Sequence, residues 1–130
     1  MQPQTELLFR LRDWIDEKLP ETKAALEELS DDGRIYLEIG PGADERRYLR
    51  GMVQNTVPVL FMAKRPGGRE AECLELLSGL CAMALAMGRP PEGTSYEAAG
   101  LEISSAPGKA ARYEDGTVLY SCIINFKIIY

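Results

Sequence analysis

Histidine is missing from the 130 residues of the chain. Its absence excludes serine or cysteine nucleophiles activated by an imidazole, and it excludes metal sites built on histidine ligands. The paired acids Asp31/Asp32 and Asp44/Glu45 flank turns and lack the companion ligands of a calcium-binding loop. We therefore expect no catalytic residue, no metal and no cofactor, and we interpret the protein as not being an enzyme.

Cysteine is scarce, with Cys73, Cys81 and Cys122 as its three positions. Their number is odd, and no two of them have the spacing of a Cys-x-x-Cys motif. Each lies on the apolar face of an expected helix or strand, where a free thiol packs as a small hydrophobic group. The pattern predicts buried free cysteines in a protein that works in a reducing cytoplasm.

Long apolar runs and an excess of positive charge are also missing. No run approaches the ~20 residues of a membrane span. Arg10, Arg12 and Asp13 interrupt the first apolar stretch, so we expect neither a secretory signal nor a membrane partner. The net charge of −5 makes the chain a poor nucleic-acid binder. Its length and its 45% apolar content predict one globular domain over residues 1–130.

Three segments have helical patterns. Residues 3–19 begin with a proline and repeat apolar side chains at helical spacing, which predicts an amphipathic helix. Residues 21–29 predict a second, shorter helix that ends in a turn at residues 30–33. Residues 69–87 are apolar almost all round and are followed by Gly88, a typical helix-ending residue. A helix this apolar must be covered on more than one side.

The remaining segments predict strands. We expect strands at residues 34–39 and 57–63, an alternating hairpin segment at 45–55, and a short strand at 101–104 before a turn at 106–108. Glu114, Asp115 and Gly116 predict a hairpin turn into a long strand at 117–130. One face of that strand is apolar at every second position, namely Val118, Tyr120, Cys122, Ile124, Phe126, Ile128 and Tyr130. Left unpaired, it would aggregate, so it must pair in a sheet or dock on another subunit.

Arg46, Arg47 and Arg50, with Lys64 and Arg65, form the basic concentration of the sequence. One interpretation is a phosphate contact. The other is a solvated strand face or an ion-pair surface between subunits. We favour the second, because no aromatic pattern of an RNA-binding module accompanies these cations.

Element order and local strings resemble the small minor capsid proteins of phages and prophages of Gram-positive bacteria, and among them the tail-terminator (tail-completion) proteins of long-tailed phages. The likeness covers almost the whole chain. The strings that carry it are Leu8-Phe9-x-x-Arg12-Asp13-Trp14-Ile15, Thr56-Val57-Pro58-Val59-Leu60-Phe61-Met62-Ala63-Lys64, Leu76-Leu77-x-x-Leu80, Ala106-Pro107, Asp115-Gly116-Thr117-Val118-Leu119-Tyr120 and the strand that runs through Phe126 to Tyr130.

The resemblance implies an α+β fold, in which two main helices pack on one face of a mostly antiparallel, twisted sheet. It implies that several copies, usually six, form a ring on the last ring of tail-tube protein, stop tube polymerisation and offer a surface to the head-completion proteins of the neck. DNA would pass through the ring without specific binding, since like charge disfavours contact. The expected location is the tail–neck junction of the virion, after assembly in the cytoplasm of the bacterial host.

A ring built head to tail needs two different complementary patches on each subunit. The candidates are the basic strand with Arg46, Arg47 and Arg50 and the acidic turns, whose residues are Asp31, Asp32, Glu114 and Asp115. Two alternatives remain open. One is a head-side connector or another head–tail joining or tail-tube component, and the other is a small-molecule-binding α+β domain.

Overall fold

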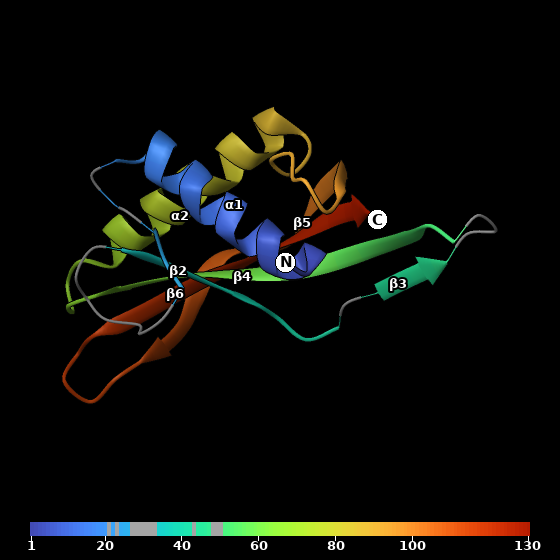
Figure 1. Cartoon of the computed structure of the whole chain (residues 1–130). Coiled ribbons are helices and arrows are strands. Elements are labelled where there is room, and N and C mark those ends of the chain that lie inside the picture. Colours follow the sequence, from blue (N-terminus) through green and yellow to red (C-terminus); the bar gives the residue numbers. More distant parts are fainter. Residues whose placement is uncertain (21, 23, 27–33, 43, 48–50) are drawn as a thin grey trace.

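Two helices lie on one face of a six-stranded sheet in the computed structural model (Figure 1). The structure describes residues 1–20, 22, 24–26, 34–42, 44–47 and 51–130. The helices are α1 (Pro3–Lys18) and α2 (Glu70–Met87). The strands are β1 (Ala24–Ala25), β2 (Ile35–Ile39), β3 (Asp44–Arg47), β4 (Val53–Arg65), β5 (Glu97–Arg112) and β6 (Val118–Ile129).

The sheet is built around the pairing of β4 with β6. These strands run antiparallel over twelve residue pairs, from Gln54 opposite Ile129 to Arg65 opposite Val118. The strand order is β1-β2-β4-β6-β5, with β3 added beside the first residues of β4. All pairs are antiparallel except β1 with β2. The expected fold class, a single α+β domain with two helices on one face of a mostly antiparallel sheet, is confirmed.

The core lies between the two helices and the inner face of β4 and β6. The predicted alternation of β6 is confirmed, because Cys122, Ile124, Phe126 and Ile128 are fully buried. The rings of Phe61 and Phe126 meet edge to face, with 6.3 Å between their centroids. The helices contribute Leu7, Leu11, Trp14, Ile15, Cys73, Leu77, Leu80, Cys81 and Ala84. All three cysteines are free and buried, as expected.

The expected helix at residues 21–29 is wrong at Ala24 and Ala25, which form β1 and pair in parallel with Ile35 and Tyr36. The amide of Ala24 also donates a 2.7 Å hydrogen bond to the Asp16 carboxylate at the end of α1. Pairing with β2 and this side-chain bond outweigh the helical propensity of a short segment. The turn expected at 30–33 lies outside the described residues.

The strand expected at 101–104 is confirmed but is longer than predicted, and the turn expected at 106–108 is wrong, since β5 is one strand of sixteen residues. β5 has four register shifts against β6, and the one between Ser105 and Gly108 accommodates the segment where the turn was expected. Pro107 is tolerated because β5 lies at the edge of the sheet, where one side of the backbone needs no partner.

The hairpin turn at Glu114, Asp115 and Gly116 is confirmed. Tyr113 donates its amide to the carbonyl of Thr117 at 2.8 Å, and Gly116 has a φ of +89° that favours glycine. The amide of Thr117 donates to the Asp115 carboxylate at 2.9 Å. Bonds from Thr117 hold the pKa of Asp115 below its usual value.

The buried carboxylate of Glu6 fastens α1 to the segment that leads into β5. It accepts hydrogen bonds from the amide and the hydroxyl of both Thr94 and Ser95, at 2.7 to 2.9 Å, and it pairs with Arg10. Gly93 allows this approach, because a Cβ there would lie 2.7 Å from the carboxylate. The bonds from Ser95 and Thr94 hold the pKa of Glu6 far below its usual value.

We expect Glu6→Gln to lower the thermal unfolding midpoint at neutral pH. The side-chain NH2 group of the glutamine would face the amides and hydroxyls of Thr94 and Ser95, which are donors and need an acceptor. The folded-state pKa of Glu6 is lowered, so its stabilisation is complete above about pH 5 and is lost as the pH falls. The difference in midpoint between wild type and variant should therefore narrow in acid. Circular dichroism melts at several pH values measure it, and a difference that stays constant with pH would contradict this account.

Candidate assembly surfaces

The outer face of α2 is apolar and exposed. Leu74 is 43% exposed and Leu85 is 59% exposed, and between Ser78 and Met87 the helix has no charged residue. Its acidic residues are confined to the first two turns. Small side chains and the backbone fill the rest of this face, at Ser78, Gly79, Ala82 and Ala86. We predicted that this helix is covered on more than one side. The sheet covers one side and α1 covers part of another, whereas no described residue covers the outer face.

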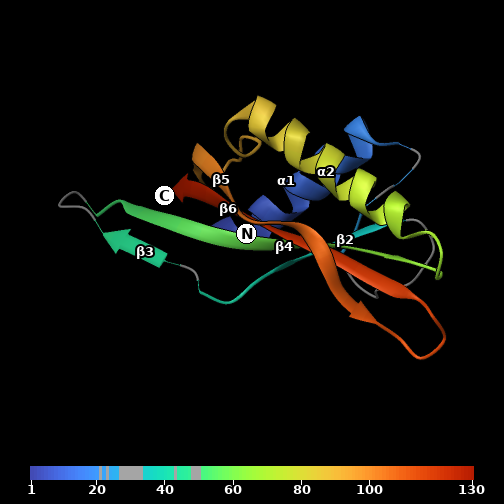
Figure 2. The same ribbon diagram turned by 180° about the vertical axis from the view of Figure 1, so that it is seen from behind.

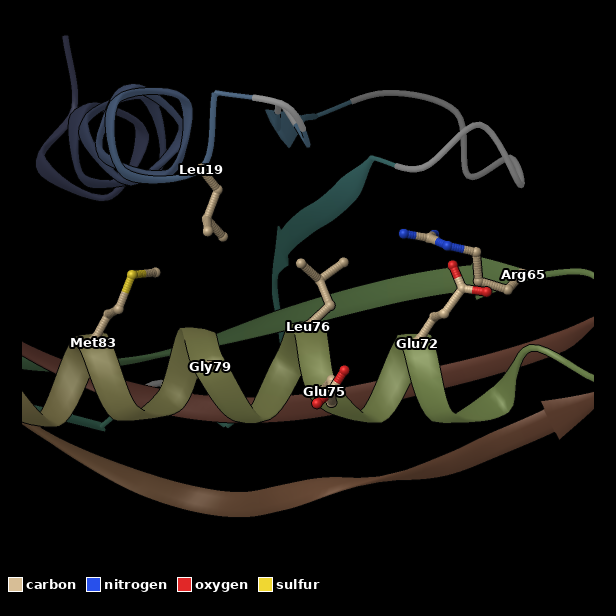
Figure 3. Close-up of a pocket in the computed structure, with 7 residues that line it drawn as sticks. All are labelled: Leu19, Arg65, Glu72, Glu75, Leu76, Gly79 and Met83. Atoms are coloured by element: carbon tan, nitrogen blue, oxygen red, sulfur yellow. The ribbon is translucent and has the colours of Figure 1, made fainter.

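A groove runs between α1 and α2 (Figure 3). One pocket of about 520 Å³ is lined by Leu19, Arg65, Glu72, Glu75, Leu76, Gly79 and Met83. A second, of about 570 Å³, is lined by Trp14, Glu17, Lys18, Met83, Ala86 and Met87. Met83 lines both pockets, and we call the two together the helix groove. Leu19, Leu76 and Met83 point toward one another across it, and Glu72 and Arg65 lie at one end.

Gly79 opens the middle of the helix groove. A Cβ added to it would meet no atom within 4 Å. Glycine inside a helix costs about 1 kcal/mol relative to alanine. No contact in the described part of the chain accounts for a glycine here, and its effect is to deepen the groove between Leu76 and Met83.

The β3–β4 hairpin reaches beyond the two helices, as both views of the ribbon show (Figures 1 and 2). We call the described residues of this hairpin, 44–47 and 51–56, the arm. Glu45, Arg46 and Arg47 are exposed on β3, and Met52 is 43% exposed where the chain turns back into β4. Of the predicted basic residues, the structure therefore places Arg46 and Arg47 on the arm, while Arg50 lies outside the described residues.

A polar cluster holds the base of the arm. The hydroxyl of Tyr130 accepts hydrogen bonds from the side-chain amides of Gln4 at 3.3 Å and Asn55 at 3.2 Å, and it donates to Glu45 at 3.4 Å. Asn55 is 1% exposed, and its Oδ1 has no hydrogen-bond partner among the described residues. One hydroxyl thus ties α1, β3, β4 and the end of β6 together, which fixes the direction of the arm.

Tyr130→Phe should lower the free energy of unfolding by about 1–2 kcal/mol, because it leaves the buried amide of Asn55 without a partner. The amides of β3 should also exchange faster with solvent. Tyr120→Phe is the matched control. It also removes one tyrosine hydroxyl, on β6, and this hydroxyl makes no hydrogen bond with the described residues. Urea unfolding and hydrogen exchange measure both variants, and equal losses in the two would contradict the proposed role of Tyr130.

The arm and the acidic turn of the β5–β6 hairpin lie at opposite ends of the sheet. β4 pairs with β3 at its beginning and with Val118, just after the turn, at its end. Its thirteen residues span roughly 40 Å at about 3.3 Å per residue. Glu114 and Asp115 are exposed in this turn, so one chain does not bring Arg46 or Arg47 to them. Asp31 and Asp32, the other predicted acidic pair, lie outside the described residues.

The described residues hold no group of three or more acidic or cysteine side chains that could bind a metal ion. Burial raises the pKa of the thiols of Cys73, Cys81 and Cys122, so they stay protonated at neutral pH. Neither of the two helices in the described part of the chain has the length and apolar character needed to cross a bilayer.

Sequence reasoning missed three features of these surfaces: the helix groove, the polar cluster at Tyr130 and the exposed leucines of α2. Gly79 within an otherwise strongly helical segment was the available signal for the groove. A scan against protein-family models finds no match for the chain, and a search of curated proteins finds no significant relative.

Proposed function

We propose that the chain is a structural virion assembly protein that acts as a tail terminator: six copies form a ring that caps the tail tube and joins it to the neck. In this role the protein stops polymerisation of the tube and offers its free side to a head-completion protein. Its place is the tail–neck junction of the virion, and its work needs shape-matched surfaces and no reactive centre.

The observation that carries this proposal is the exposed, largely apolar outer face of α2. Leu74 and Leu85 present apolar area to solvent on a helix whose composition is that of a buried one. Covering this face with another protein removes the cost of its exposure, at about 25 cal/mol for each Å² of apolar area. An exposed apolar face of this kind is typical of a subunit that assembles with other proteins.

The charge of the chain supports the same role. The net charge of −5 suits a subunit that surrounds DNA during its passage, because like charges keep the polymer from sticking to the channel. The fold supports it as well, since the strands of an open antiparallel sheet leave edges and a helix layer available for neighbouring subunits.

The test compares two substitutions on one helix. Leu85→Glu places a charge on the exposed face, so we expect the melting temperature to change little while self-assembly and binding to purified tail tubes are lost. Leu80→Glu buries an unpaired charge at a fully buried position, so we expect it to unfold the domain. Light scattering and negative-stain imaging of protein mixed with tubes measure assembly.

Two results would count against the proposal. One is wild-type protein that stays monomeric and fails to cap tail tubes at any concentration tested. The other is a Leu85→Glu variant that assembles as well as wild type. Specific binding to the head side in place of the tube would favour a head-side connector.

A further inference from the structure

We propose that Cys81 and Cys122 form an oxidisable thiol pair, and that a peroxide joins them in a disulfide that ties α2 to β6 after the particle leaves the reducing cytoplasm. The structure holds both residues as free, buried thiols, which is the reduced form of the pair. The timing of the bond rests on the proposed function, because a virion component passes from the host cytoplasm to an oxidising medium. The placement and the chemistry of the pair are independent of that function.

Cys73 fixes the position of α2 along the sheet. Its thiol donates a 3.7 Å hydrogen bond to the carbonyl of Ala63 on β4. From there the helix runs toward the other end of the long strands, since α2 begins shortly after Arg65 and the next strand, β5, begins opposite Ile129. Both views of the ribbon show α2 over the face of the sheet that the helices cover (Figures 1 and 2).

The spacing along α2 brings Cys81 to the level of Cys122. Cys81 follows Cys73 by just over two helical turns, an advance of about 12 Å at 1.5 Å per residue. On β4, the step from Ala63 to Phe61 is roughly 7 Å and the step to Val59 is roughly 13 Å, at about 3.3 Å per residue. The advance of the helix ends between these two levels. Phe61 is the residue that pairs with Cys122, and both cysteines belong to the same buried cluster.

The two thiols are close enough to act on each other. Burial raises the pKa of Cys81, and a side-chain hydrogen bond with Cys122 opposes that rise. Burial likewise raises the pKa of Cys122, and negative charge on Cys81 raises it further. At Cys73 burial also raises the pKa, but the other side chains that act on it are Arg65 and the charged residues at the start of α2. The interaction therefore singles out Cys81 and Cys122 as the pair.

Cys73 is the competing partner, and it fits less well. It lies about 12 Å from Cys81 along one helix, whereas the Cα atoms of a disulfide lie within about 7 Å of each other. Its thiol is directed at the Ala63 carbonyl on β4, away from the thiol of Cys122 on β6. Cys73 is also fully buried, so an oxidant has no direct path to its sulfur.

The exposed fractions of the two thiols assign their roles. Cys81 is 8% exposed and Cys122 is fully buried, so hydrogen peroxide reaches Cys81 first. The Cys81 thiolate attacks one peroxide oxygen and the O–O bond breaks, which leaves a sulfenic acid on Cys81 and a hydroxide that takes up the thiol proton. The sulfur of Cys122 then attacks the sulfur of Cys81, the S–O bond breaks, and the hydroxyl leaves as water with the Cys122 proton. Two thiols and one peroxide thus give one disulfide and two waters.

The raised pKa values make this reaction slow at neutral pH, which suits a bond that forms after assembly. The thiolate is the form that attacks peroxide. Below the pKa of a thiol, the thiolate fraction rises tenfold with each pH unit, so the rate of disulfide formation should rise about tenfold from pH 7 to pH 8. In the reducing cytoplasm the pair stays reduced while the chain folds and assembles.

The bond would fasten the helix layer to the sheet. α2 carries the exposed face with Leu74 and Leu85 on which the proposed ring depends. A helix that is covalently joined to β6 cannot separate from the sheet, so the subunit keeps this face in place. The bond also closes a loop that contains β5 and the hairpin turn, which restricts the unfolded chain.

Mass spectrometry of the folded protein tests the chemistry. Purified, reduced protein is treated with dilute hydrogen peroxide at pH 8, then unfolded and alkylated. We expect the mass of the chain to fall by two hydrogen atoms and one cysteine to be alkylated in place of three. Fragmentation of the peptides should place the bond between Cys81 and Cys122, and dithiothreitol should restore three alkylated cysteines.

Alanine variants identify the partners. Cys73→Ala should still form the bond, whereas Cys81→Ala and Cys122→Ala should each abolish it. Alanine at position 122 leaves a cavity in the core. If that variant fails to fold, the peptide map of the wild type decides the outcome.

Oxidation should also stabilise the protein. We expect the thermal unfolding midpoint of wild type and of Cys73→Ala to rise by roughly 10 °C after peroxide treatment and to return with dithiothreitol. Cys81→Ala treated in the same way should keep its midpoint. Circular dichroism melts measure each protein, and capped tail tubes treated with peroxide should lose their caps more slowly in urea than untreated ones.

The outcomes separate this inference from the proposed function. Sulfinic or sulfonic acid on Cys81 without a cross-link, a bond between chains, a bond to Cys73, or thiols that react only in denaturant would each overturn the inference. Rings that cap tail tubes but never form the bond would overturn it and leave the function standing. A bond between Cys81 and Cys122 in protein that never caps tubes would support the pair and count against the tail-terminator role.

Discussion

The twelve-pair ladder between β4 and β6 is the constraint on which the rest of the structure depends. It places the inner faces of both strands in register, so that Phe61 and Phe126 meet under the helices. It also fixes where the arm and the helix groove lie, because β4 begins at one and ends at the other. A shift of one residue would turn the core side chains of the shifted strand toward solvent, which makes this register strongly specified.

Much of this fold could be predicted from the sequence because two simple periodicities dominate it. The alternation of β6 and the apolar stripe of α1 follow directly from side chains that must be buried. The prediction failed where tertiary contacts decide the structure. Ala24 and Ala25 join β2 despite a helical composition, and β5 continues through Pro107 because a neighbouring strand holds it and register shifts absorb the irregularity.

The candidate surfaces were harder to predict for the same reason. The basic cluster with Arg46 and Arg47 was visible as a run of like charge, but its position at the opposite end of the sheet from Glu114 and Asp115 was not. A groove between two helices depends on how α1 and α2 cross the sheet, which no local pattern encodes. Likewise, nothing near Tyr130 in the sequence indicates that its hydroxyl meets Gln4, Glu45 and Asn55.

The hydrogen bonds between Glu6 and Ser95 join segments that are far apart in the sequence, which bears on how the chain folds. The two residues are 89 positions apart, and β4 also precedes its long partner by the whole of α2 and β5. During synthesis, the apolar stripe of α1 and the edge of β4 emerge well before the segments that cover them. Folding therefore depends on pairings between distant segments, and the unpaired strand stays open to aggregation until those pairings form.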